Sequence, residues 1–157
     1  HLMHSQKNSK GLVELLFSPS RGALFAKLSE QFSAQLKSLN EKTKIVKIAI
    51  ESWMKKLVLK DCKSLLNRYS EKLSLYPKGI RIKEQKNLWG SCGKDKIINI
   101  NWHLIHAPYK ILEYVVVHEM VHLKYRNHTE EFWTLLRSTF RESDYCDEWL
   151  GKYQITV

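Results

Sequence analysis

Apolar residues recur every three or four positions in the first half of the chain, and this spacing predicts two α-helices. The first covers residues 24–39, and we expect its apolar stripe to be buried. The second begins near Lys44 and ends at the YPKG sequence of residues 76–79, because proline and glycine together break a helix. The stripes consist of Leu24, Leu28, Phe32, Leu36 and Leu39 in the first helix, and Val46, Ala49, Ile50, Trp53, Leu57, Leu65, Leu66, Tyr69 and Leu73 in the second.

Two short segments in the middle of the chain alternate between apolar and polar residues, which is typical of β-strands. They are residues 80–83 and residues 97–102, and in the second segment Ile98, Ile100 and Trp102 fall on one face. The sequence KNLWGSCGKDK lies between them. Its two glycines and its Asp-Lys pair favour a turn or a long hairpin loop.

Helical spacing returns in the last third of the chain. It predicts one helix from about Tyr109, directly after Pro108, to Lys124, and a second from about Thr129 to Arg141. Helices on both sides of a short run of strands are typical of the α+β class, in which a small sheet lies against a layer of helices. We therefore expect an α+β fold.

The helix predicted from residue 109 contains the sequence VVVHEMVHL, where two histidines and a glutamate follow the most apolar run of the chain. Positions four apart face the same way on a helix, so His118 and His122 can bind one zinc ion together. Glu119 lies about 100° further round the helix axis, where it can reach a water molecule instead of the metal. This is the position of a general base, and the motif predicts a catalytic zinc site.

A catalytic zinc ion takes three protein ligands and keeps one position open. We expect His128 to be the third ligand, because the YRN sequence before it should end the helix and turn the chain back. The spacing of His118 and His128 also occurs in metzincins. Tyr125, however, stands where that pattern has glycine, and no methionine follows His128, which excludes a metzincin. Other third ligands remain open: Glu130, Glu131, Glu142, Cys146, His103 and His106.

The composition is that of a globular protein, with 157 residues of which 43% are hydrophobic and 27% are charged. No apolar run approaches the roughly 18 residues of a membrane span, so we expect no membrane partner. Three cysteines without a CxxC pair argue against a disulfide framework and against a thiolate zinc finger. We expect a cytoplasmic protein.

The net charge of +10 is concentrated in the middle of the chain. Residues 44–96 contain 14 Lys and Arg against 5 Asp and Glu, a balance of +9. A stretch of this kind is often a solvated helix face, and it is also the electrostatic signature of a protein that binds nucleic acid. Nucleic acid is therefore an alternative partner, although the sequence does not identify contact residues for it.

Five motifs follow one another along the chain: KNLWGSC (86–92), ININWHLIHAP (98–108), YVVVHEMVHL (114–123), NHTEEFW (127–133) and EWL (148–150). In this order they resemble the YgjP-like metallopeptidases, a cytoplasmic zincin family related to the SprT-like and Wss1-like proteases. The resemblance implies a zincin-like fold, with a small sheet packed on helices and the HExxH motif on a central helix, and a metallopeptidase domain in residues 44–157. Residues 1–43, helical or irregular by their sequence, are expected to form an accessory segment before it.

The resemblance also implies an activity: zinc-dependent peptide hydrolysis through a metal-activated water, with one zinc ion per chain. Its metal ligands correspond to His118, His122 and His128, and its catalytic glutamate to Glu119. The chain departs from the family at Leu88 and His103, where arginine is common.

The substrate of such an enzyme is a protein or peptide, and an extended peptide can add a strand to the edge of a sheet. We expect residues 97–102 to form this edge. The candidate substrate contacts are Trp89, Ile98, Ile100 and Tyr125, and Tyr125 and His103 are candidates for stabilising the oxyanion. The alternative function is a nucleic-acid-associated zinc module, or a DNA-recruited protease of the SprT type, that uses residues 44–96.

Overall fold

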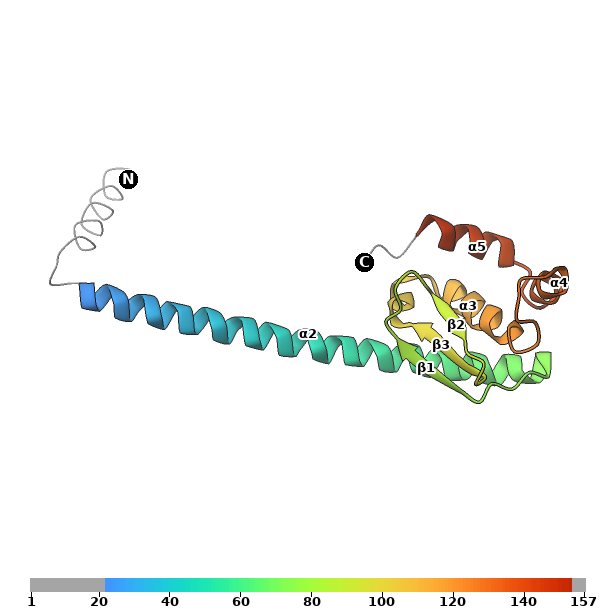
Figure 1. Cartoon of the computed structure of the whole chain (residues 1–157), viewed down its shortest axis with the longest axis horizontal. Helices are drawn as coiled ribbons and strands as arrows, with labels where there is room; N and C mark the ends of the chain where they lie inside the picture. Colours follow the sequence, from blue (N-terminus) through green and yellow to red (C-terminus); the bar gives the residue numbers. More distant parts are fainter. Residues whose placement is uncertain (1–21, 154–157) are drawn as a thin grey trace. The chain divides into compact units, whose positions relative to one another are not determined.

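The computed structural model of the protein describes residues 22–153, with side chains from Ser29 onward. Residues 1–21, the first part of the expected accessory segment, lie outside the described residues. The chain divides into two compact units, His1–Ala49 and Ile50–Val157. In residues 22–153, four α-helices and a three-stranded sheet confirm the predicted α+β class (Figure 1).

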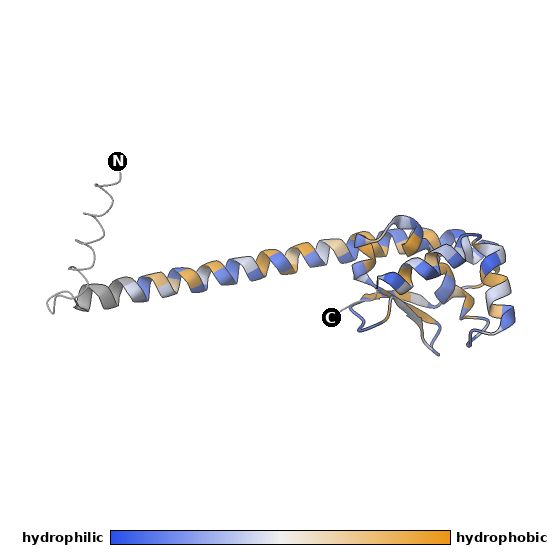
Figure 2. Ribbon diagram, turned by 90° about the horizontal axis from the view of Figure 1, so that it is seen from above, coloured by the Kyte–Doolittle hydropathy of each residue, from blue (hydrophilic) through white to orange (hydrophobic). Residues whose placement is uncertain are grey.

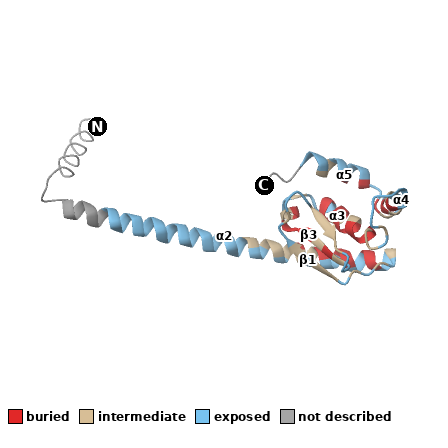
Figure 3. Ribbon diagram, in the orientation of Figure 1, coloured by how far each residue is buried: buried red, intermediate tan, exposed pale blue. Residues whose placement is uncertain are grey.

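The first described element, α2, is one helix from Gly22 to Leu73, so the two helices predicted here are continuous. The expected burial of the first stripe was wrong, because Phe32, Leu36 and Leu39 are 62%, 46% and 59% exposed (Figure 3). The described part of the His1–Ala49 unit contains only this helix, so no other described element of that unit covers its apolar stripe. Its apolar residues alternate with polar ones along the exposed stretch (Figure 2). The side chains of Leu24 and Leu28 lie outside the described residues.

Within the Ile50–Val157 unit, α2 does bury one face. The helix then ends in a Schellman motif, in which the Leu75 amide donates to the Ser70 carbonyl at 3.2 Å and the Ser74 amide to the Glu71 carbonyl at 3.4 Å. Ser74 takes the left-handed conformation at the end of the motif, with φ 53°. The buried side chains of this part of α2 are Val58, Cys62, Leu65, Leu66, Tyr69 and Ser70.

The sheet has the strand order β1-β3-β2. Strands β1 (Gly79–Lys83) and β3 (Ile97–Asn101), both predicted, pair in parallel, and β2 (Gly90–Cys92) pairs antiparallel to β3. The hairpin partner of β3 is therefore β2, a strand within the segment that we expected to be only a loop. Three residues are too few to produce an alternating pattern, and the flanking glycines favour a turn reading.

The remaining helices follow β3 in the chain, and one of them, α3, carries the predicted HExxH motif. A 3-10 helix, η2 (Trp102–His106), follows β3, and then come α3 (Tyr109–Val121), α4 (Glu130–Thr139) and α5 (Ser143–Lys152). Helices α3 and α4 correspond to the two predicted helices, whereas α5 was not predicted, because its sequence is short and mostly polar. Helix α3 contacts the sheet as well as α4 and α5, so it forms the centre of this unit.

Hydrogen bonds and apolar contacts connect α2 and the sheet to α3. The Glu113 carboxylate accepts hydrogen bonds from Arg68 at 3.0 Å and from the Tyr69 hydroxyl at 2.8 Å, which joins α2 to α3. On the other side, the buried Ile98 and Ile100 of β3 belong to the same apolar core as α3. None of the helices in residues 22–153 is long and apolar enough to cross a membrane.

Candidate metal centre and active site

Three histidines meet at the carboxyl end of α3. His118 lies in the last turn of the helix, His122 is its C-cap residue, and His128 follows in the loop before α4. One ring nitrogen from each histidine lies within 4.8 Å of the other two, so these residues could hold a metal ion. The structure thus brings together the three histidines that the spacing singled out.

The orientation of the rings suits a shared ligand. The Nε2 atoms of His118 and His128 are 3.0 Å apart. His122 Nδ1 is 2.9 Å from the Tyr125 carbonyl, to which it donates its proton, so its Nε2 carries the free lone pair. Ligand nitrogens around a tetrahedral zinc ion at 2.0–2.1 Å lie about 3.3 Å apart. The donor set and its spacing therefore fit a zinc ion.

Two aromatic side chains of α4 pack against the three histidines. The ring of Phe132 on α4 is fully buried, and its centroid lies 4.9, 4.6 and 4.7 Å from those of His118, His122 and His128. Trp133 stacks on His128 with the ring planes 25° apart. Phe132 therefore packs against all three imidazoles.

Burial also sets the charge state of the first histidine. The surrounding apolar residues lower the pKa of His118 to about 3, and the neighbouring His122 and His128 add to the effect. Burial lowers the pKa of His122 as well. Neutral imidazoles are the form that binds metals, so this environment keeps the ligand atoms competent at neutral pH.

Tyr114 and Asp147 form a chain of polar contacts that ends at His118. The Tyr114 hydroxyl is 3.5 Å from His118 Nδ1 and donates to Asp147 Oδ1 at 3.1 Å. Hydrogen bonds of this kind orient a ligand ring from behind. Sequence reasoning missed both residues, because Asp147 lies on α5, which was not predicted, and Tyr114 meets it only when α3 and α5 pack together.

Glu119 lies beside the histidines in an apolar setting. Its side chain is buried, and this burial raises its pKa to about 8. Gly90 of β2 makes the position possible, because a Cβ on Gly90 would lie 2.9 Å from Glu119 Cγ. The sequence did not indicate this role, although a glycine within a strand often marks a close approach of another group.

A cavity of about 500 Å³ opens onto the histidines and Glu119. Strand β2 and its neighbours form one wall of the cavity, and the loop after α3 forms another. Its lining residues are Leu88, Gly90, Ser91, Cys92, Lys94, His118, Glu119, His122, Arg126 and His128.

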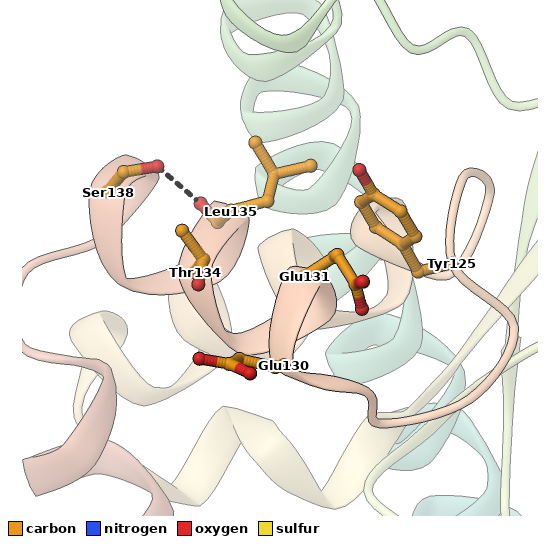
Figure 4. A pocket seen from close by; sticks show the side chains of 6 residues that line it. All are labelled: Tyr125, Glu130, Glu131, Thr134, Leu135 and Ser138. Atoms are coloured by element: carbon orange, nitrogen blue, oxygen red, sulfur yellow. Dashed lines mark hydrogen bonds between the residues drawn. The ribbon is translucent and has the colours of Figure 1, made fainter.

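Several predicted site residues lie elsewhere. Tyr125 lines a separate cavity of about 430 Å³ with residues of α4, where Figure 4 also shows the hydrogen bond from Ser138 to the Leu135 carbonyl. His103 lies on η2, 3.4 Å from Glu84. Neither residue lines the histidine cavity, which argues against both as oxyanion stabilisers. The other third-ligand candidates, Glu130, Glu131, Glu142, Cys146 and His106, are absent from the metal-competent group found in the described residues.

The expectation that residues 97–102 form a free edge was wrong. Strand β3 is paired on both sides, and Ile98 and Ile100 are fully buried, because they pack into the core with α3. Trp89 is partly buried and also packs against this core. The edge next to the histidine cavity is β2.

Comparison with known proteins agrees with this geometry. The YgjP-like metallopeptidase domain family matches residues 14–153. The chain is similar to the crystal structure of the metallopeptidase zymogen abylysin of Pyrococcus abyssi, at 20% identity and a TM-score of 0.52, over 58% of this chain and 93% of that chain. It is also similar to the zymogen jannalysin of Methanocaldococcus jannaschii, at 26% identity and a TM-score of 0.51, over 58% and 94%.

No curated protein matches the chain. The likeness to the two zymogens supports the fold, and the family match extends over most of the sequence. Three histidines that can hold a metal ion meet beside a buried glutamate in that matched region. The chain therefore belongs to the YgjP-like metallopeptidase family and is a metal-dependent hydrolase.

Proposed function

We propose that this chain is a zinc peptidase in which His118, His122 and His128 hold the metal and Glu119 is the general base. The observation that carries the proposal is the meeting of three imidazoles with one buried carboxyl group at a single cavity. Three protein ligands leave a fourth position for chemistry, as in catalytic zinc sites. When bound there, zinc supplies Lewis acidity that polarises the scissile carbonyl and lowers the pKa of a water molecule.

Glu119 takes the proton of the attacking water and returns it to the leaving amine. A general base works best when its pKa is near the operating pH, and burial raises the pKa of Glu119 to about 8. A nearby cation would lower this value towards neutrality. The contact with Gly90 fixes the carboxyl group next to β2, where a substrate would lie.

The proposed substrate is an extended polypeptide that pairs with β2. The Asn101 amide donates to the Trp89 carbonyl at 2.9 Å, and the Gly93 amide to the Ile97 carbonyl at 3.0 Å. In an antiparallel pair these bonds occur at alternate residues. The N–H and C=O groups of Gly90 and Cys92 therefore point away from β3. Those groups are the ones that an added strand would use. Glu119 lies beside Gly90, since a Cβ on Gly90 would lie 3.0 Å from Glu119 Oε1, and the Cys92 carbonyl lies 3.4 Å from Arg126 Nη1.

We also propose that the enzyme works in the cytoplasm. Cys62, Cys92 and Cys146 are all free thiols, two of them buried, which suits a reducing compartment.

The test is the Glu119→Gln variant, measured for zinc content and turnover in one preparation. Gln is nearly isosteric with Glu but cannot accept the proton, so zinc content and folding should match the wild type while hydrolysis falls by about 10²–10⁴. Substrates should include unfolded proteins and DNA-bound proteins. A variant that retains zinc and cleaves at the wild-type rate would remove Glu119 as the base.

A second candidate function is recruitment to nucleic acid through residues 44–96. The observation that favours it is that the basic side chains of this stretch are almost all exposed, and that only Arg68 and Arg81 among them form ion pairs with described carboxylates. If several phosphates are contacted, log affinity for duplex DNA should fall with log salt by about 0.9 per contact. Absence of binding at low salt would exclude this function.

A further inference from the structure

The cavity beside the histidines carries two cations at one end. The side chains of Lys94 and Arg126 both line it, and they come from different elements: the turn after β2 and the loop after α3. Glu119 is the one carboxyl group in the lining, and it lies at the other end of β2, against Gly90. The far end of the cavity is therefore positively charged.

Backbone contacts hold Arg126 in this place. Its Nη1 atom donates to the Gly93 carbonyl at 3.1 Å and lies 3.4 Å from the Cys92 carbonyl. A guanidinium group has five N–H donors, and these contacts use only Nη1. Within residues 29–153, neither Arg126 nor Lys94 forms an ion pair. Two cations without a carboxylate partner thus face the space where the substrate would lie.

We propose that Arg126 and Lys94 form a subsite for a carboxylate of the substrate, either an Asp or Glu side chain or the carboxyl terminus. The inference rests on the proposed peptidase function and names its substrate class. Strand residues are about 3.4 Å apart, so Cys92 and Gly93 lie roughly 7–10 Å along β2 from Gly90. A substrate paired with β2 therefore carries its carboxylate two or three residues from the bond next to Glu119. Arginine binds carboxylates through two parallel hydrogen bonds, and Lys94 adds a second charge.

Binding can be tested without turnover, in the zinc-loaded Glu119→Gln variant. Fluorescein-labelled peptides are compared in pairs that differ by Glu against Gln at one position, or by a free against an amidated carboxyl terminus. We expect the carboxylate form to bind about tenfold more tightly in one of these pairs, and the advantage to shrink at high salt. The pair that shows the advantage identifies the source of the carboxylate.

The basic residues are then replaced on the same background by Arg126→Gln and Lys94→Gln. Each change should reduce the ratio of the two affinities, and the double variant should bring it near one. Arg141→Gln removes one positive charge outside the cavity and should leave the ratio unchanged. Melting temperature and zinc content show whether Arg126→Gln has disturbed the loop, and Lys94→Gln, which changes an exposed side chain, tests the subsite independently.

Wild-type cleavage of a mixed peptide library completes the test. Cleavage at sites with a carboxylate two or three residues away supports the subsite. Cleavage without this preference, or equal affinity of the variant for both members of every pair, overturns it. A wild-type protein that cleaves nothing argues against the peptidase function, and the affinity ratios then decide the subsite separately.

Discussion

Gly90 on β2 and Glu119 on α3 touch with no room for a methyl group between them. A Cβ on Gly90 would lie 2.9 Å from Glu119 Cγ, 3.0 Å from Glu119 Oε1 and 2.9 Å from Val115 Cγ1. The strand proposed to bind substrate and the helix that carries the proposed base therefore lie in close contact. A side chain added at Gly90 must displace Glu119 or Val115.

We predict that Gly90→Ala greatly reduces peptide hydrolysis while zinc content is retained. The added methyl group displaces the Glu119 side chain, and overpacking of this kind costs about 1–3 kcal/mol of unfolding free energy. Turnover, zinc content and urea unfolding measure the three effects. Gly79→Ala is the matched control, because nothing lies within 4 Å of its Cβ position and its φ is not positive. Equal activity of the two variants would contradict the prediction.

We predict that His118→Ala, His122→Ala and His128→Ala each lose most of the bound zinc after dialysis. Removing one of three ligands leaves a site that cannot hold the ion against a weak chelator. Mass spectrometry of dialysed protein measures the stoichiometry, and His106→Ala serves as the control, since His106 lies outside the group. Full zinc stoichiometry in His128→Ala would show that another residue completes the site.

We predict that the metal-free protein loses stability as pH rises from about 6.5 to 8. Burial raises the pKa of Glu119 from 4.5 to about 8, so in this range the folded protein keeps a proton that the unfolded chain has released. The free energy of unfolding then falls by about 1.4 kcal/mol per pH unit. The pKa of His118 is lowered from 6.5 to about 3. This shift makes the free energy of unfolding rise with pH, but only below about pH 6.5.

Urea unfolding of chelator-treated protein at several pH values measures this slope. In Glu119→Gln the carboxyl group is gone, so the slope between pH 6.5 and 8 should be much smaller than in the wild type. Parallel curves for the two proteins would show that Glu119 does not hold the proton.

We predict that Asn101→Ala destabilises the protein by about 3 kcal/mol. The buried Asn101 side chain donates to the Gln85 and Leu88 carbonyls at 2.9 and 3.0 Å and accepts from the His103 amide at 3.1 Å. Each such bond contributes about 1 kcal/mol net. Denaturant unfolding measures the loss, with Asn87→Gly as a control in the loop that Asn101 contacts, because Asn87 is exposed and has φ 59°. A loss below about 1 kcal/mol in Asn101→Ala would contradict this role.

The histidine spacing was informative because His118, His122 and Glu119, the first two proposed ligands and the proposed base, lie within one turn and a half at the end of α3. Local geometry fixes such a set, so His118, Glu119 and His122 could be located from the sequence. His128 required only that the chain reverse after the helix. Tyr114 and Asp147, by contrast, come together only when α3 and α5 pack, and no local pattern encodes that contact.

The sheet was predicted less well for a similar reason. Residues 79–83 and 97–101 carry the alternation of strands, but β2 is three residues long and β3 lies between two neighbours. Strand order depends on contacts between distant residues, so the edge was assigned to the wrong strand. The prediction that Phe32, Leu36 and Leu39 are buried was wrong. Spacing shows that a helix has an apolar face, but it does not show that another element covers that face.

The position of the histidines at the carboxyl terminus of α3 has an electrostatic consequence. Peptide dipoles along a helix add up to about half a negative charge at this end, where the last carbonyl groups have no partner within the helix. A cation held by His118 and His122 is attracted by the helix backbone as well as by the side chains. The attraction survives substitution of any side chain but fades within one turn. A variant that extends α3 beyond Val121 would move this negative pole away from the ligand nitrogens.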